Sequence, residues 1–177
     1  MSELTQFRES KDRYFKFDHH SPLLPEQQKR FGGLNYFDAN PDLHFVLSIE
    51  TYDDHQIVVM ATSTGGAAEF LRYGKITFEV EAETASLTVY VSQNGGGFFL
   101  PFTDATTGDE TYESGRYLEI DPQADGTYIV DFNMAYNPYC AYNDHWTCPI
   151  PPDENRLSVP IRAGEKVYPD AVHSHGH

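Results

Sequence analysis

Long apolar runs are absent from the 177-residue sequence, and no charged start is followed by an apolar stretch. A transmembrane helix needs about 20 consecutive apolar residues, and a secretory leader needs a basic start followed by an apolar segment. We therefore expect a chain that neither crosses a membrane nor is exported, and we predict a cytoplasmic location.

Basic residues are also scarce, with 12 lysines and arginines against 27 acidic residues and a formal net charge of −15. A surface of this charge repels phosphate backbones, and no local basic stripe offsets it, so we exclude nucleic-acid binding. Only five of the basic residues are lysines. A carboxylate-rich, lysine-poor surface stays soluble when salt screens ordinary charges, which favours a halophilic, archaeal source over an ordinary acidic protein.

Cysteine is limited to Cys140 and Cys148, with His145 between them. In a cytosolic chain, two cysteines are more often thiols or metal ligands than a disulfide. Zinc or iron could bind Cys140, His145 and Cys148 if water or another side chain supplied the fourth donor. A disulfide, two inert buried thiols, and a cysteine nucleophile activated by His145 remain as alternatives.

Tyrosine and phenylalanine are plentiful, with twelve of each, and both favour β-strands. Seven strand-like runs lie between residues 43 and 134, separated by short turns. We predict a mainly β fold, a single-domain antiparallel β-barrel or β-sandwich. The predicted strands lie at 43–50, 55–62, 70–80, 85–93, 96–102, 115–120 and 126–134.

The β core at 43–134 belongs to one predicted domain at 1–168, which begins with a helical segment at 3–31. After Ser2, a suitable N-cap, apolar side chains recur on one helical face. Pro25 can open a second short helix. The apolar face of this segment must therefore lie on another part of the domain, and we predict that the helix crosses one end of the barrel or sandwich.

Residues 135–168 follow the β core and are rich in proline. Proline holds the chain extended and cannot enter a helix interior or a central strand. We predict a rigid strap here, with a last strand that Pro160 restricts to a sheet edge. Residues 169–177 are predicted to be a flexible, His-containing tail.

The predicted strand at 126–134 carries a polar pair. Alternation places Asp131 and Asn133 on the face opposite an apolar face that ends at Met134. Buried polar groups need partners, and Arg116 is the obvious counterpart because only six basic residues follow residue 30. We therefore expect Arg116 to lie beside Asp131.

A guanidinium in this position can also hold a ligand carboxylate or phosphate, so the cluster predicts a pocket for a small anionic molecule. The predicted ligand-binding residues are Arg116, Tyr112, Asp131, Asn133, Tyr136 and Asn137, with Glu154 and Asn155 from the strap. A polar cluster that only fixes the chain after residue 134 is the alternative.

Two long blocks have an unusual composition. They are FLPFTDATTGDETYESGRYLEI at residues 99–120 and DFNMAYNPYCAYNDHWTCPIPPDENRLSVPIRAGEK at residues 131–166. With the earlier HHSPL and FGGLNYF, these blocks resemble the family catalogued as domain of unknown function 1684. The resemblance implies a prokaryotic family whose activity, ligand and cofactor are unassigned, and His145 falls outside its pattern.

Three functional hypotheses follow from the sequence. The first is a domain that binds a small anionic molecule in the predicted pocket. The second is a metal-dependent enzyme, such as a hydrolase, that uses the region of Cys140, His145 and Cys148. The third is a structural or partner-binding module.

Overall fold

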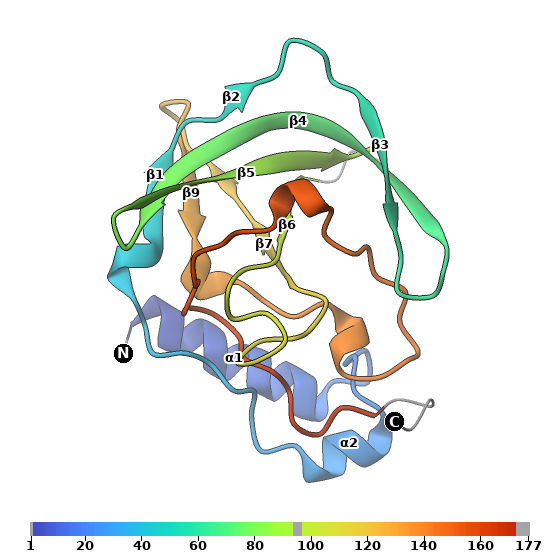
Figure 1. The fold of residues 1–177 in the computed structure, drawn as a ribbon. Coiled ribbons are helices and arrows are strands. Elements are labelled where there is room, and N and C mark those ends of the chain that lie inside the picture. The colour runs from blue at the N-terminus through green and yellow to red at the C-terminus, as the bar shows by residue number, and fades with distance from the viewer. Residues whose placement is uncertain (1, 94–96, 173–177) are drawn as a thin grey trace.

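The computed structural model describes residues 2–93 and 97–172, which form mainly antiparallel β-strands with two α-helices at the N-terminus (Figure 1). The helices are α1, Glu3–Phe17, and α2, Pro25–Arg30. The Oγ of Ser2 accepts a hydrogen bond from the backbone N–H of Thr5, as expected of an N-cap. No helix of the described residues has the length and apolar composition of a membrane span.

Helices α1 and α2 lie together on one side of the strands (Figure 1). The N-terminal segment shares a small apolar cluster with the strap. The buried residues of this cluster are Phe15, Leu23, Phe31, Leu34, Tyr142 and Tyr168. The ring of Phe15, 2% exposed, meets the ring of Tyr142 edge to face at 5.2 Å. The predicted amphipathic helix is thus confirmed, and its apolar face packs on the strap.

Six strands form the larger sheet, in the order β2-β4-β5-β6-β7, with β3 also paired to β4. The long β4–β5 hairpin arches across the molecule (Figure 1). The strands are β2 Glu50–Thr51, β3 Ile57–Ala61, β4 Ala67–Val80, β5 Glu83–Ser92, β6 Phe98–Phe102 and β7 Arg116–Glu119. Each predicted run between residues 55 and 120 overlaps one of the strands β3 to β7.

The smaller sheet has the order β1-β9-β8. Its strands are β1 His44–Leu47, β8 Asp121–Pro122 and β9 Tyr128–Asp131. No ladder joins the two sheets among the described residues, so they do not close into a barrel. The prediction of a mainly β fold with antiparallel sheets is confirmed.

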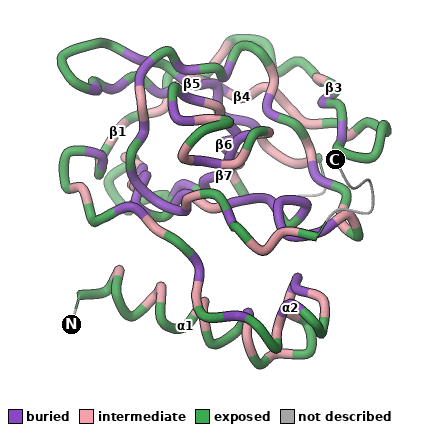
Figure 2. The backbone as a smooth tube through the Cα atoms, turned by 60° about the horizontal axis from the view of Figure 1, so that its bottom comes forward, coloured by how far each residue is buried: buried purple, intermediate pink, exposed green. Residues whose placement is uncertain are grey.

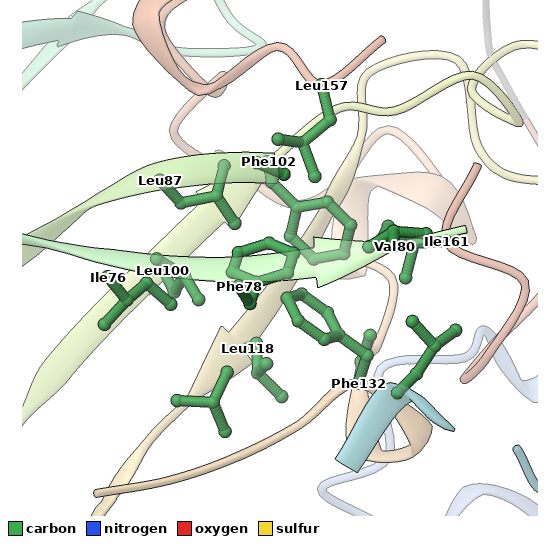
Figure 3. Packing of buried hydrophobic residues seen from close by; sticks show 14 of the residues in the cluster. Ile76, Phe78, Val80, Leu87, Leu100, Phe102, Leu118, Phe132, Leu157 and Ile161 are labelled. Carbon is green, nitrogen blue, oxygen red and sulfur yellow. The ribbon is translucent and has the colours of Figure 1, made fainter. Parts of the chain in front are cut away.

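One hydrophobic core draws side chains from both sheets (Figure 3). The ring of Phe132 lies 5.2 Å from that of Phe78 on β4 and 5.5 Å from that of Phe102 on β6. Leu157 and Ile161 of the strap complete this core. Figure 2 shows the buried stretches concentrated in the β region, whereas α1 and α2 are mostly exposed. Burial of the apolar faces of the strands therefore makes the main favourable contribution to the free energy of folding.

Strand β9 ends earlier than predicted. Residues Phe132–Met134 form a 3₁₀ turn, η2, in which the side chain of Asp131 accepts from the backbone N–H of Asn133. Strand alternation stops at this turn, so Met134 is 36% exposed instead of reaching the core. Three further 3₁₀ turns are η1 Pro41–Leu43, η3 Tyr139–Ala141 and η4 Asp153–Asn155.

The predicted last strand is wrong, because residues 157–168 form no strand. Their backbone groups find other partners. The N–H of Leu157 donates to the carbonyl oxygen of Thr103 at 2.8 Å, and the N–H of Ile161 donates to Asp104 Oδ2 at 2.5 Å. A loop backbone and a side chain thus take the place of a neighbouring strand.

The beginning of the predicted tail is attached to the domain. The side-chain amide of Gln27 donates to the carbonyl oxygen of Asp170 at 2.9 Å, and Arg30 forms an ion pair with the Asp170 carboxylate at 3.1 Å. Residues 173–177, which contain the three tail histidines, lie outside the described residues, as do residues 94–96 of a predicted turn.

Candidate functional site

Arg116 begins β7, and its guanidinium is buried, with 1% of the residue exposed. Its Nη1 donates to the carbonyl oxygens of Ala163 at 2.5 Å and Glu165 at 3.2 Å, and its Nη2 donates to that of Ile161 at 2.8 Å. The Asp104 carboxylate lies 3.5 Å from Nη2. Burial lowers the pKa of Arg116 to about 10, and Asp104 opposes this, so the group stays charged at neutral pH. Arg116 therefore holds the strap on the sheet.

The predicted pairing of Arg116 with Asp131 is wrong. Asp131 Oδ1 accepts from the backbone N–H of Asn133 at 3.0 Å and from its Nδ2 at 2.8 Å, while Oδ2 lies 3.4 Å from His44 Nδ1. Asn133 is bound to Asn40 through two further hydrogen bonds, of 2.8 and 2.9 Å. The polar pair lies together as expected, but it fixes η2 and the chain entering β1.

Asn137 also forms hydrogen bonds within the fold, one of them to the buried carboxylate of Glu165. Glu165 Oε1 accepts from the backbone N–H of Asn137 at 3.1 Å and from the hydroxyl of Tyr142 at 2.8 Å. Its Oε2 forms an ion pair with Lys11 of α1. Asn137 Nδ2 donates to the carbonyl oxygen of Lys166 at 3.0 Å. This network attaches α1 to the strap.

Glu154 and Asn155 bind η4 of the strap to the larger sheet. Asn155 is fully buried; its Oδ1 accepts from Thr88 N–H at 2.8 Å, and its Nδ2 donates to the carbonyl oxygens of Thr88 and Pro101. Glu154 forms an ion pair with Arg72 of β4, with 2.8 Å between Oε1 and Nη2. Both predicted ligand-binding residues thus face strands of the sheet.

The two cysteines lie side by side as free thiols. Cys140 and Cys148 are 6% and 8% exposed, and the backbone N–H of Cys140 donates to Cys148 Sγ at 3.4 Å. The Tyr112 hydroxyl lies 3.6 Å from Cys140 Sγ, so it does not converge with Arg116 on one site. A hydrogen bond from Cys148 is the main cause that lowers the pKa of Cys140 to about 6. Cys140 in turn raises the pKa of Cys148.

His145 does not join the cysteines in a ligand group. It is exposed, and its backbone N–H donates to Asn143 Oδ1 at 3.0 Å. Among the described residues, the one group of His, Cys, Asp and Glu whose ligand atoms lie within 4.8 Å of one another is Asp18, His19 and His20, which lies near the surface. The metal-enzyme hypothesis therefore has no assembled ligand set around the cysteines in the described part of the chain.

A hollowed region that the sequence did not reveal lies beside β7 and is here called the β7 groove. It consists of two hollows of about 340 Å³ and 250 Å³ that share Glu119 and Tyr136. The first, here called the aromatic hollow, is also lined by Phe70, Ser92, Gly97, Phe98, Phe99, Tyr117 and Pro149. The second, here called the acidic hollow, is also lined by Phe7, Leu118, Asp121, Ile129, Asp131 and Met134. Tyr136 is the predicted site residue that both hollows contain.

Four rings form a continuous row in the aromatic hollow. Phe70 and Phe99 stack at 5.3 Å, Phe99 meets Tyr117 at 4.7 Å, and Tyr117 meets Tyr136 at 5.9 Å between centroids. Burial raises the pKa of both tyrosines, so their hydroxyls stay protonated. Glu119, which forms a hydrogen bond with Tyr136, is the acidic group of this hollow. The row offers stacking area with a carboxylate at one end.

The acidic hollow carries the carboxylates of Glu119, Asp121 and Asp131, and no lysine or arginine lines it among the described residues. Lys11 approaches the Tyr136 ring to 5.1 Å, but its ammonium group pairs with Glu165. The charged side chains that line the two hollows are therefore all acidic, which favours cations over anions.

A sequence signal for this groove exists only in part. Alternation in GRYLEI places Glu119 on the outer face of β7, and the register pairs it with Phe99 of β6. Phe70 and Tyr136 come from distant segments, and only the tertiary fold brings them to the same row.

The comparisons with other proteins identify relatives without a known activity. The family model described as protein of unknown function (DUF1684) matches residues 29–166. No curated protein matches the chain. An uncharacterised protein of Haloarcula marismortui, solved by solution NMR, is 35% identical, with a TM-score of 0.69 over 93% of this chain and 92% of that one.

Proposed function

The chain belongs to the DUF1684 family of proteins of unknown function, which assigns no activity, and we therefore propose from the site alone that it binds a small molecule in the β7 groove. The row of four rings beside Glu119 is the observation that supports this proposal. Ligand sites are typically apolar and aromatic hollows of about 300–1,000 Å³ with a few polar groups. The aromatic hollow, of about 340 Å³, lies within that range.

The ligand class follows from the charges of the groove. Three carboxylates and no lysine or arginine line the acidic hollow among the described residues, and the buried Arg116 is fully engaged elsewhere. A cationic group beside the carboxylates, attached to an apolar or aromatic body on the rings, matches both hollows. The proposed ligand is thus a small organic cation, in place of the anion expected from the sequence.

We further propose that the protein works in the reducing, high-salt cytoplasm of a halophilic prokaryote. The excess of acidic residues and the scarcity of lysine support this setting, as does the resemblance to a protein of Haloarcula marismortui. The two neighbouring free thiols are consistent with a reducing compartment.

Two fragments of similar shape and opposite charge test the proposal. NMR titration of the full chain with phenethylamine should shift the backbone amides of β6, β7 and Tyr136, because the ammonium group faces Glu119. Titration with 3-phenylpropanoate should shift them much less. Glu119→Gln should weaken phenethylamine binding about fivefold, since it removes one charge partner that contributes about 1 kcal/mol.

Glu79→Gln is the matched control, because it makes the same charge change on the exposed Glu79 of β4, which does not line the groove. It should leave the affinity for phenethylamine unchanged. The proposal fails if neither fragment shifts the groove amides, or if both Gln variants bind phenethylamine equally well.

A further inference from the structure

The loop that joins the two cysteines is held from both sides. Asn143 Nδ2 and Trp146 Nε1 donate to the same carbonyl oxygen, that of Pro22, at 2.8 and 3.0 Å. These bonds fix the loop between Cys140 and Cys148 relative to the N-terminal segment. The backbone positions of the two cysteines are therefore held relative to each other.

A second segment holds Cys148 itself. Ser63 Oγ accepts from the backbone N–H of Cys148 at 3.1 Å, and the N–H of Ser63 donates to the carbonyl oxygen of Cys148 at 2.9 Å. On the other side, η3 places the N–H of Cys140 3.4 Å from Cys148 Sγ. Cys148 Sγ is thus held against the backbone of Cys140 before any chemistry begins.

The two sulfur atoms also differ in character. Cys140 Sγ is contacted by the Tyr112 hydroxyl at 3.6 Å, and the hydrogen bond with Cys148 lowers the pKa of Cys140. Cys148 keeps its proton next to it. A thiolate beside a protonated thiol is the arrangement of an attacking cysteine with a resolving cysteine.

We propose that Cys140 and Cys148 form a reactive dithiol that reduces small hydroperoxides and closes to a disulfide. The Cys140 thiolate attacks the terminal oxygen of ROOH, so that an S–O bond forms and the O–O bond breaks. The alkoxide takes a proton and leaves as ROH, and Cys140 becomes a sulfenic acid. Cys148 sulfur then attacks Cys140 sulfur, an S–S bond forms, and the S–O bond breaks with release of water.

The size of the oxidant follows from burial. The two cysteines are 6% and 8% exposed and lie in a cluster with the half-buried rings of Tyr112 and Trp146. Burial to this degree excludes a protein disulfide from the sulfur atoms, so the proposed oxidant is a compact hydroperoxide. In each cycle the peroxide gains two electrons and the dithiol loses two, and an external thiol restores the reduced pair.

Intact-mass spectrometry of the full chain tests the proposal. Hydrogen peroxide should convert the wild-type protein to a monomer lighter by two hydrogen atoms, and dithiothreitol should restore the original mass. Cys148→Ser should stop at the sulfenic acid, which dimedone traps at Cys140. Cys140→Ser should give at least about tenfold less dimedone adduct, because the Tyr112 hydroxyl contacts Cys140 Sγ and can stabilise its thiolate.

The wild-type result does not depend on whether the variants fold. If peroxide leaves the native mass unchanged while both thiols oxidise in urea, the cysteines are inert core residues and the proposal is overturned. Stable oxygen addition without disulfide formation overturns the role of Cys148, and equal dimedone labelling of the two variants overturns that of Cys140. None of these outcomes bears on fragment binding in the β7 groove.

Discussion

The guanidinium of Arg116 replaces a neighbouring strand for the last part of the strap. Three carbonyl oxygens of residues 161–165 accept its hydrogen bonds, and Asp104 accepts the N–H of Ile161 while balancing the charge. A buried ion pair adds little stability compared with an apolar pair of the same shape, but the loss of one partner leaves an unpaired charge. Arg116 and Asp104 therefore have to be present together.

We predict that Arg116→Ala lowers the free energy of unfolding by about 3–5 kcal/mol, because Asp104 and the carbonyl groups lose their partner. Urea denaturation followed by circular dichroism measures this loss. Arg162→Ala is the control: Arg162 is 57% exposed in its pair with Glu110, and exposed pairs contribute at most about 1 kcal/mol. Equal losses in the two variants would contradict the scaffold role of Arg116.

The β4–β5 hairpin is the longest element of the fold, and its turn carries backbone strain. Glu81 and Ala82 connect Val80 to Glu83 with φ of 51° and 69°. A two-residue hairpin turn of type I′ has positive φ at both positions, and its twist matches that of the strands. Residues with a Cβ adopt this conformation at a cost of roughly 1 kcal/mol each. The hairpin is thus stable because of its long ladder, despite its turn.

Ala82→Gly should raise the free energy of unfolding by about 1 kcal/mol, because glycine adopts positive φ without a steric penalty. Thermal or urea denaturation gives the value. Gly126→Ala provides the opposite case, since Gly126 has a φ of 88° and free space around its Cα; it should destabilise by a similar amount. A loss of stability in Ala82→Gly would show that the Ala82 side chain contributes more than the strain costs.

At the scale of the whole molecule, charge and core are separated. Apolar side chains of both sheets and of the strap fill one core. The whole sequence has 27 acidic residues but only 12 basic ones. The most buried ion pairs of the described residues, Lys11–Glu165 and Arg116–Asp104, each use one of these few basic side chains. The remaining surface charge is therefore strongly negative and repels itself at low salt.

The melting temperature should rise from low to multimolar KCl, because salt screens this repulsion. Differential scanning calorimetry of the full chain measures the change. Sucrose at matched osmotic strength is the control for stabilisation by exclusion, and it should raise the melting temperature less. A protein that is most stable at low salt would contradict the high-salt setting.

Much of the fold was predictable because local patterns specify it. The N-cap of α1, the proline that opens α2 and the alternating runs of the strands all depend on neighbouring residues. The predictions of secondary structure are wrong where a side-chain hydrogen bond competes with the local sequence pattern. Asp131 ends β9 by accepting the N–H of Asn133, and Arg116 removes the need for a strand near Pro160.

The candidate site was less predictable than the fold. The sequence suggested that Arg116, Tyr112 and Asp131 meet, but each has a different partner in the structure. It also grouped His145 with the cysteines, and the described residues bring only Cys140 and Cys148 together. Side-chain partners over long sequence distances depend on packing, and spacing along the chain carries little information about them.

By itself, the sequence determined the β-rich class, the amphipathic first helix, the acidic surface and the family, since composition, periodicity and long motifs carry these properties. Only the tertiary structure decided that Arg116 belongs to the scaffold, that four rings and three carboxylates line one groove, and that two thiols face each other. The physical reason is that burial and hydrogen bonding select one partner for each polar group, and that choice exists only once the core has formed.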